Sequence, residues 1–250
     1  MAVFDYEQVS KLSPAVARDR REQSPCSACS VRGMTICAPL DAQELTQVSA
    51  IMTSVELEAG APLFDEGEEA GNVFNVTSGT IKVYKLLPDG RRQVTGFLFP
   101  GDFLGLAKQE TYAFSAEAVT PSMLCRFPRH KLETLMQRLP KIEQRLLSIA
   151  SNELVAAQEQ MLLLGRKTAR EKIASFLLML SKRARQRGQA GDPVTVPMSR
   201  TDIGDYLGLT TETVSRTFTQ LKQDSTIQLL PNHQVKLARR DALEEIAGGF

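Results

Sequence analysis

Four cysteines are the residues with the most distinctive chemistry. Three fall in one segment with the spacing Cys26-x2-Cys29-x7-Cys37, and Cys125 stands alone much later in the chain. A C-x2-C spacing brings two sulfurs to one metal centre with little chain strain, and iron–sulfur clusters take four thiolates. Four cysteines also suit structural zinc, and Cys125 is explained as well by a small buried hydrophobe. On spacing alone, a cluster, a zinc site and no metal remain open.

A second chemistry-bearing segment covers residues 199–222. Ser199 is predicted to cap a helix, with Asp202 completing a capping box, and that helix stops at Gly208. Thr210 caps a second helix that buries an apolar face. Two short helices across a glycine turn form a helix-turn-helix, whose second helix lies in the major groove of DNA.

The early positions of that second helix carry side chains that read bases. Glu212 can accept a hydrogen bond from cytosine N4, Arg216 can fork onto guanine O6 and N7, and Ser215 lies between them. Thr210 and Thr211 open the same helix and complete the predicted DNA-binding set. The alternative is a plain helical hairpin with a surface ion pair between Glu212 and Arg216, worth roughly tenths of a kcal/mol.

Short strands at 194–197, 227–230 and 235–237 bracket these helices, with a tight turn at 231–233. Strands in this position convert a helix-turn-helix into a winged helix, and the wing would contact backbone phosphate.

Lys and Arg are concentrated towards the C-terminal end of the chain. Residues 1–164 hold 16 of them against 20 Asp and Glu, whereas residues 165–250 hold 14 against 9, so the basic end is expected to meet phosphate.

Residues 140–164 must position the reading helices. Apolar residues recur there in alternating steps of three and four, which is a heptad seam. The seam consists of Leu147, Ala150, Leu154, Ala157, Met161 and Leu164. A second apolar face carries Leu146, Ile149, Ala156 and Leu163. Two faces predict two partners, the chain's own sheet domain and a second copy, although an ordinary helix buried within one chain remains the alternative.

Between the cysteine segment and this helix, residues 55–127 form short alternating or apolar runs punctuated by glycine. Runs of this kind predict an antiparallel sandwich or roll. The turn at 88–90 reads Pro-Asp-Gly, in which proline presets φ and glycine supplies a positive φ. Cys125 falls on a predicted strand.

Several function classes are disfavoured. The chain of 250 residues has a net charge of only +1, no signal-peptide pattern and no apolar run long enough to cross a membrane, so we expect a cytoplasmic protein without membrane contact. In a reducing cytosol the cysteines are more naturally thiolates than disulfides. The sequence shows neither a nucleophile–base pair nor a phosphate-cradling loop, so nothing in it indicates an enzyme. Neither His130 nor His233 lies in a setting typical of a haem ligand.

The order of a cysteine segment, a glycine-punctuated roll, a heptad helix and a helix-turn-helix resembles the CRP/FNR superfamily of bacterial transcription regulators. Within it, the chain is similar to the FNR branch of oxygen-responsive regulators, of the FnrL/FnrN type. The resemblance extends from about Cys26 to Ala247. Its most specific blocks are residues 79–84, 101–105, 202–210 and 212–216.

The resemblance implies an α+β fold: an N-terminal antiparallel β-roll of the cyclic-nucleotide-binding kind, a long dimerisation helix and a C-terminal winged helix-turn-helix. The expected segments are an arm and cysteine loop at 1–40, the sensor roll at 41–139, the dimerisation helix at 140–165 and the DNA-binding domain at 166–250.

The resemblance also implies function. Cys26, Cys29, Cys37 and Cys125 match the family's ligands for a 4Fe–4S cluster, which under anaerobiosis promotes an active homodimer. Glu212, Ser215 and Arg216 match the FNR-type Glu-x-x-Ser-Arg helix, which reads a double-stranded palindrome of the form TTGAT-N4-ATCAA. RNA polymerase is the expected protein partner. The loop at 87–92 is a candidate contact for it, and an ordinary solvent-exposed turn is the favoured alternative for that loop. The alternative is a CRP-like regulator of the same fold that has another effector, zinc or no cofactor.

Departures from the family bear on these expectations. The C-x2-C-x7-C spacing is longer than the C-x2-C-x5-C of the best-known member and matches the FnrL/FnrN variant. Ala157 stands where some FNR proteins place an acidic residue that keeps the cluster-free form monomeric, so cluster loss is not expected to dissociate this dimer fully. The stretches at 105–108 and 114–116 lack the arginine and glutamate that bind a cyclic nucleotide, so no cyclic nucleotide is expected.

Overall fold

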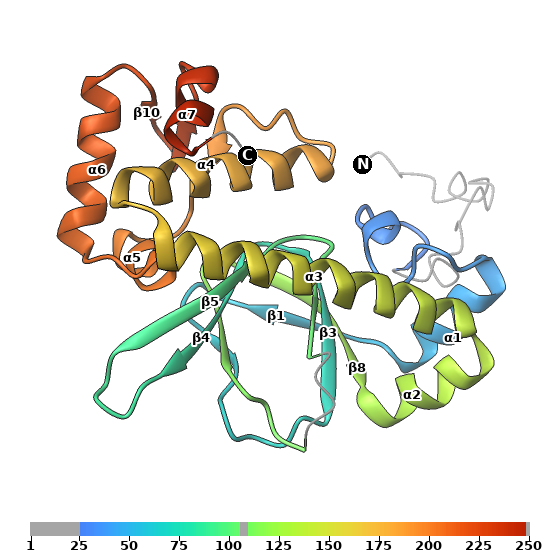
Figure 1. The fold of residues 1–250 in the computed structure, drawn as a ribbon. Coiled ribbons are helices and arrows are strands. Elements are labelled where there is room, and N and C mark those ends of the chain that lie inside the picture. The colour runs from blue at the N-terminus through green and yellow to red at the C-terminus, as the bar shows by residue number, and fades with distance from the viewer. Residues whose placement is uncertain (1–25, 106–109, 249–250) are drawn as a thin grey trace, which may run out of the picture.

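The computed structural model describes residues 26–105 and 110–248. The N-terminal arm predicted up to residue 24 lies outside the described residues, as do residues 106–108 of the stretch used to argue against a cyclic nucleotide. Along the described chain, a cysteine segment leads into an antiparallel β-roll, a long helix and a C-terminal domain (Figure 1). This is the predicted architecture.

The β-roll consists of two four-stranded antiparallel sheets within the described residues. One sheet has the order β1-β8-β3-β6 and the other the order β2-β7-β4-β5. The strands are β1 (Thr53–Leu57), β2 (Pro62–Phe64), β3 (Asn72–Ser78), β4 (Ile81–Leu86), β5 (Arg92–Leu98), β6 (Phe103–Leu104), β7 (Ser115–Ala118) and β8 (Ser122–Pro128). Apolar side chains from both sheets fill the space between them, and the rings of Phe64 and Tyr112 stack against each other there. The turn between β4 and β5 uses Gly90 at a φ of 83°, as its sequence predicts.

A separate apolar core lies between the roll and two short helices. Helix α1 (Ala42–Ile51) begins at a capping box made by Asp41 and Glu44, and α2 (Arg129–Arg138) follows β8 directly. Buried side chains of both helices pack against residues of β3, β8 and the cysteine segment. This core therefore brings the two cysteine-bearing parts of the chain together.

The cysteine segment has regular structure of its own. A short 3-10 helix, η1 (Arg32–Met34), lies between Cys29 and Cys37. Val31 and Ile36 on either side of it are buried, Ile36 completely. These apolar side chains anchor the segment, because exposing them would forfeit their burial free energy.

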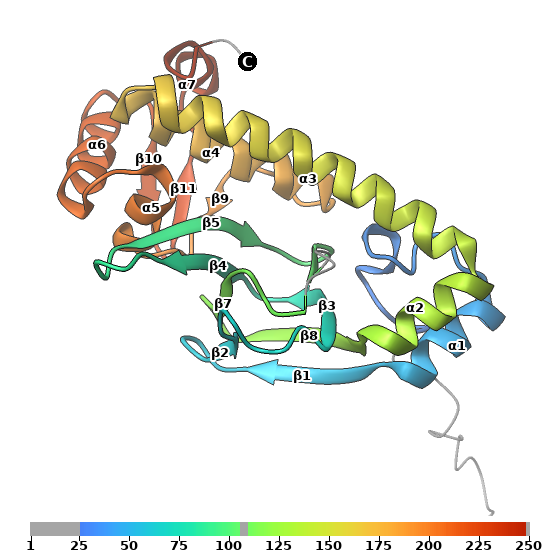
Figure 2. The same cartoon turned by 60° about the horizontal axis from the view of Figure 1, so that its bottom comes forward.

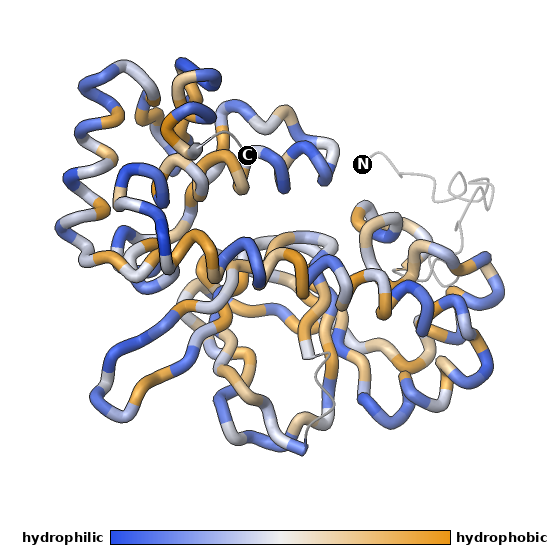
Figure 3. Tube along the Cα trace, in the orientation of Figure 1, coloured by the Kyte–Doolittle hydropathy of each residue, from blue (hydrophilic) through white to orange (hydrophobic). Residues whose placement is uncertain are grey.

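Helix α3 (Pro140–Arg166) runs over the roll and on to the C-terminal domain (Figures 1 and 2). Proline at its first turn suits a position whose N–H has no partner within the helix. Ile142 and Leu146 are buried in the core with the cysteine segment, and Leu163 packs against the C-terminal core. Hydrophobic and hydrophilic residues alternate along the helix (Figure 3). One helix thus contacts both halves of the molecule.

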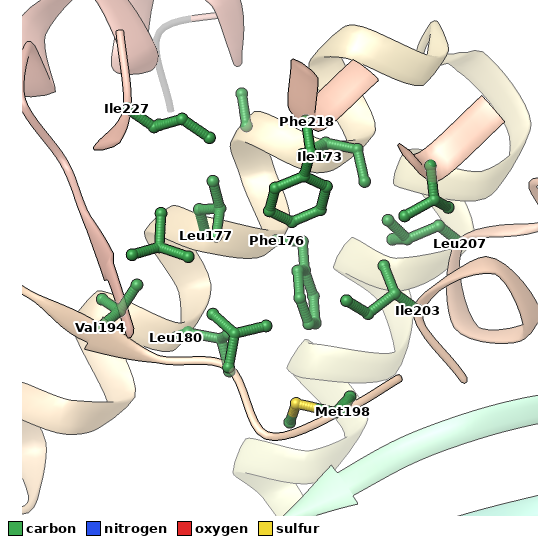
Figure 4. Packing of buried hydrophobic residues seen from close by; sticks show 14 of the residues in the cluster. Ile173, Phe176, Leu177, Leu180, Val194, Met198, Ile203, Leu207, Phe218 and Ile227 are labelled. Carbon is green, nitrogen blue, oxygen red and sulfur yellow. The ribbon is translucent and has the colours of Figure 1, made fainter. Parts of the chain in front are cut away.

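The C-terminal domain contains four helices and a three-stranded sheet within the described residues. These elements are α4 (Ala169–Gln186), β9 (Val194–Thr195), α5 (Arg200–Leu207), α6 (Thr211–Gln223), β10 (Gln228–Leu230), β11 (Gln234–Lys236) and α7 (Arg240–Ile246). Phe176 of α4 lies at the centre of their core, among Ile203 and Phe218 (Figure 4). Val94, Phe97 and Phe99 of the roll belong to the same core, so the two halves share buried apolar surface.

Candidate nucleic-acid interface and cysteine centre

Helices α5 and α6 meet at a short, tight turn. Ser199 caps α5, its hydroxyl accepting a hydrogen bond from the Asp202 N–H while the Asp202 carboxylate accepts from the Ser199 N–H. Gly208 ends α5 in the left-handed conformation, at a φ of 63°. A side chain on Gly204 would place its Cβ 2.6 Å from the carbonyl oxygen of Leu209. Glycine at 204 and 208 therefore allows the close approach that a helix-turn-helix needs.

Helix α6 has one buried and one exposed face. The Thr210 hydroxyl caps it by accepting a hydrogen bond from the Thr213 N–H. Val214, Phe218 and Leu221 are buried in the C-terminal core. The predicted DNA-contacting residues lie on the other face and are exposed: Thr210, Thr211, Glu212, Ser215 and Arg216. The exposed face is consequently available to an external partner.

The surface ion pair offered as the alternative for this face is absent. Among the ion pairs of the described residues, none joins Glu212 to Arg216. The Ser215 hydroxyl donates to the carbonyl oxygen of Thr211, 2.9 Å away, which leaves its lone pairs to accept from a base. Both charged side chains thus retain their hydrogen-bonding groups for an external partner.

The predicted wing also forms. Strands β10 and β11 pair antiparallel, and β11 pairs with β9. Asn232 and His233 make the connecting turn with positive φ angles of 56° and 57°. His233 lies on this exposed turn, and His130 lies exposed at the start of α2.

Ion pairs between the roll and α5 were not predicted from the sequence. The Lys82 ammonium of β4 lies 3.0 Å from the Asp202 carboxylate, and the Arg92 guanidinium of β5 lies 2.7 Å from the same carboxylate. Arg92 also pairs with Asp205 at 2.8 Å. Lys82 and Arg92 could be placed on neighbouring strands from the sequence, but nothing local in the sequence identifies their ion-pair partners on α5.

The four cysteines lie around one apolar core. Cys26 and Cys37 are buried within it, Cys125 packs against it from β8, and Cys29 is half-buried nearby. None of the four forms a disulfide. Burial is the main cause that raises the pKa of Cys125 to about 12, and the nearness of the other three cysteines raises it further. The fold therefore gathers the predicted ligand set in one region.

Burial also raises the pKa of Cys37, to about 11, and nearby Cys26 and Cys29 add to the shift, whereas a hydrogen bond with Thr35 opposes it. In the conformation described, no three His, Cys, Asp or Glu side chains of the described residues are arranged to hold a metal ion. The donor chemistry fits a thiolate-bound group, since soft sulfur ligands select iron–sulfur clusters or zinc.

Arg145 of α3 joins the cysteine segment to the long helix. Its guanidinium donates to the carbonyl oxygens of Met34 and Thr35, at 2.6 and 3.2 Å. Sequence periodicity places Arg145 on the polar side of the helix and gave no reason to single it out. The contact provides a direct connection between the segment that carries three cysteines and α3.

The predicted seam of α3 is largely uncovered. Leu147, Leu154 and Met161 are 69%, 62% and 70% exposed, and Ala150 and Ala157 are exposed as well. Leu164 is half-buried and contacts the region of Gly208. This exposed face does not fit an ordinary helix buried within one chain.

No helix among the described residues combines the length and apolarity needed to span a bilayer.

Comparison with known proteins identifies the two halves. Residues 54–139 match the cyclic nucleotide-binding domain family, and residues 171–246 match the Crp-like helix-turn-helix domain family. The nitrogen fixation regulation protein FixK of Bradyrhizobium diazoefficiens is 40% identical over 88% of this chain and 92% of its own length. The transcriptional activator protein FnrL of Cereibacter sphaeroides is 39% identical over 89% and 92%.

The solved structure of FixK2 from Bradyrhizobium japonicum superimposes with a TM-score of 0.73 at 36% identity, covering 78% of this chain and 97% of that one. The matching families and relatives are regulators of transcription and not enzymes. The helix-turn-helix geometry, its exposed reading face and these similarities agree. The chain therefore belongs to the CRP/FNR family of DNA-binding transcription regulators.

Proposed function

We propose that this regulator senses oxygen in the cytoplasm through a 4Fe–4S cluster held by Cys26, Cys29, Cys37 and Cys125. The observation that carries the proposal is the gathering of four cysteines that form no disulfide, from two distant parts of the chain, around one apolar core. When bound, the cluster would supply an oxygen-labile link between the cysteine segment and β8. The same four thiols suit zinc, so a CRP-like regulator with zinc or without metal is the alternative that the experiment below distinguishes.

Arg145 supports the connection from the cysteine centre to DNA binding. Its two hydrogen bonds hold the carbonyls of Met34 and Thr35 against α3, so the position of the segment bears on the start of that helix. Ile142 and Leu146 are buried in the same core as Cys26 and Cys37. A segment held in place keeps α3 in register, and a released segment loosens its first turns.

The uncovered seam of α3 supports pairing with a second copy. An apolar stripe of this length exposed on a helix is typical of a surface that buries itself in an oligomer. A homodimer formed through it would set two α6 helices about one DNA turn apart, matching a palindrome of the form TTGAT-N4-ATCAA. Ala157 in the seam carries no charge, so pairing is expected to weaken without ending when the cysteine centre empties.

The β4–β5 hairpin is the surface we assign to RNA polymerase. Leu86 and Leu87 at its tip are 57% and 38% exposed, next to the Pro-Asp-Gly turn. The tip of the hairpin lies at the same end of the molecule as α5 and α6 and away from the start of α3 (Figures 1 and 2). A polymerase bound there would leave the dimer seam of α3 unobstructed.

The decisive experiment measures cofactor and DNA affinity together. Protein purified without air is analysed for iron and acid-labile sulfide, and its affinity for a TTGAT-N4-ATCAA duplex is followed during titration with air. The proposal predicts iron and sulfide in equal amounts and a DNA affinity that falls as the visible absorbance is lost. Zinc in place of iron would support the alternative, and full DNA affinity without iron and sulfide would refute oxygen sensing.

A further inference from the structure

One buried side chain beside the cysteine centre carries an oxygen atom without a partner. Asn75 of β3 is only 2% exposed, and its Oδ1 atom makes no hydrogen bond. Buried polar groups in native proteins are nearly always satisfied, because an unpaired one forfeits its hydration without compensation. The unpaired Oδ1 therefore indicates that a partner of the Asn75 amide is missing. Because a half-turn about the last side-chain bond exchanges the oxygen and the NH2 group, that partner can be an acceptor as well as a donor.

The sheet register places Asn75 at Cys125. Asn75 lies directly opposite Cys125 on β8 and opposite Phe103 on β6. Side chains directly opposite on antiparallel strands share a face, with Cβ atoms roughly 5 Å apart. The amide is consequently within side-chain reach of the Cys125 sulfur.

The face on which Asn75 lies is the one turned to the cysteine segment. Its neighbours Val73 and Phe103 belong to the core that also buries Cys26 and Cys37, whereas Phe74 and Val76 point to the other side, into the roll. Asn75 is thus the polar member of an otherwise apolar wall facing the thiols. Its position in the run Val73-Phe-Asn-Val76 is a signal that sequence analysis did not use.

We propose that Asn75 is a positioning residue for the cysteine centre, its side-chain amide donating a hydrogen bond to a sulfur of the occupied site. This inference rests on the proposed cluster. Cysteine thiolate and inorganic sulfide accept N–H hydrogen bonds, and the amide can turn about its last bond to present either N–H or oxygen. Hydrogen bonds to sulfur stabilise the more reduced, more negative state of a cluster and raise its reduction potential. Asn75 therefore slows oxidation by air.

An isosteric pair of variants tests this role. Asn75→Val removes every hydrogen-bonding group, and Asn75→Thr has nearly the same shape but keeps a hydroxyl donor. Ser54→Ala is the matched control, because Ser54 lies opposite Cys125 on the other neighbouring strand but is exposed. Each full-length protein is purified without air, assayed for iron and sulfide, and then followed by the rate of absorbance loss in air and by its reduction potential.

We expect Asn75→Val to lose its absorbance about tenfold faster than wild type, the size of effect typical of an outer-shell partner. Its potential should fall, while Asn75→Thr and Ser54→Ala stay close to wild type. The iron-free proteins should show the opposite order, with Asn75→Val melting at a higher temperature than Asn75→Thr, because an empty site leaves the threonine hydroxyl unpaired. If Asn75 had a purely structural role, Asn75→Val and Asn75→Thr would rank in the same order with and without iron.

The outcomes separate the two proposals. Wild-type protein without iron and sulfide would overturn the cluster, and this inference with it. Wild-type protein with a cluster, whose lifetime and potential are unchanged by Asn75→Val, would overturn the role of Asn75 alone. Equal effects of Asn75→Val and Asn75→Thr would likewise exclude a hydrogen bond.

Discussion

The Lys82 ammonium lies 3.0 Å from the Asp202 carboxylate, and this ion pair joins the β-roll to the first helix of the helix-turn-helix. Both side chains are almost fully buried, at 7% and 9% exposure. Asp202 also completes the capping box of α5. One carboxylate thus serves the start of α5 and the contact between the two halves of the molecule.

Removing the charge of Asp202 should loosen that contact. Asp202→Asn weakens the bonds from both Lys82 and Arg92, so we expect a loss of about 2 kcal/mol in the free energy of unfolding. Hydrogen exchange should rise in β4, β5 and α5. Glu117→Gln is the control, because Glu117 pairs with Lys82 from within the roll at 2.9 Å. Equal exchange in the two variants would show that the contact does not hold the halves together.

The same carboxylate gives a pH prediction. Burial alone would raise the pKa of Asp202, but hydrogen bonds from Ser199 and Lys82, with the charges of Lys82 and Arg92, lower it below its ordinary value. A lowered pKa in the folded state gives stability above the ordinary pKa, which is lost as the pH falls through the folded value. The difference in urea midpoint between wild type and Asp202→Asn should therefore be constant near neutral pH and shrink below about pH 4. A difference that grows in acid would contradict this assignment.

The long-range contacts show where sequence reasoning stops. The caps at Ser199 and Thr210 and the break at Gly208 were predictable, because each depends on residues within one helical turn. The Lys82–Asp202 pair joins residues 120 positions apart, and periodicity within a strand or a helix carries no information about such a partner.

The cysteine region likewise has features that the sequence predicts and features that it does not. Cys125 could be placed on a strand because its neighbours alternate, and the structure confirms that strand. The anchoring of the segment by Ile36 and the contacts of Arg145 could not be predicted, because both depend on how the segment packs against elements far along the chain. Asn75 became conspicuous only once the register set it opposite Cys125.

Arg216 should read a base. Arg216→Ala is expected to cost about 1–3 kcal/mol of binding to the palindrome and to relax selectivity at one base pair of each half-site. The measurement is affinity for duplexes carrying each substitution at that position. Lys222→Ala, on the exposed end of the same helix, is the comparison for a phosphate contact. Loss of a phosphate contact weakens binding to all sequences alike. Uniform weakening by Arg216→Ala would make Arg216 a phosphate contact too.

The seam of α3 should carry the dimer. Leu154→Asp places a charge in an apolar face that is 62% exposed in the single chain, so it should leave folding intact and give monomers. Asn152→Asp adds the same charge on the opposite side of the helix and should leave the dimer in place. Sedimentation at several protein concentrations distinguishes the two. A dimer that survives Leu154→Asp would exclude this seam.

Arg145 should transmit the state of the cysteine segment to α3. Arg145→Ala removes two charge-assisted hydrogen bonds to the carbonyls of Met34 and Thr35 but none of the thiols. We therefore expect iron content close to wild type and a DNA affinity that responds less to air. Arg145→Lys should resemble Arg145→Ala, because one ammonium cannot fork onto two carbonyls as a guanidinium does.

The control for Arg145 is Lys141→Ala, one turn earlier on α3. Lys141 pairs with Glu44 of α1 at 2.9 Å on the exposed surface, so its removal leaves the cysteine segment untouched. Limited proteolysis between Val31 and Cys37 gives a readout that needs no cluster. Cleavage there should accelerate in Arg145→Ala and Arg145→Lys but stay at the wild-type rate in Lys141→Ala. If Arg145→Ala left cleavage unchanged, the buried Ile36 would be sufficient to hold the segment, and the connection to α3 would have to pass through the shared apolar core.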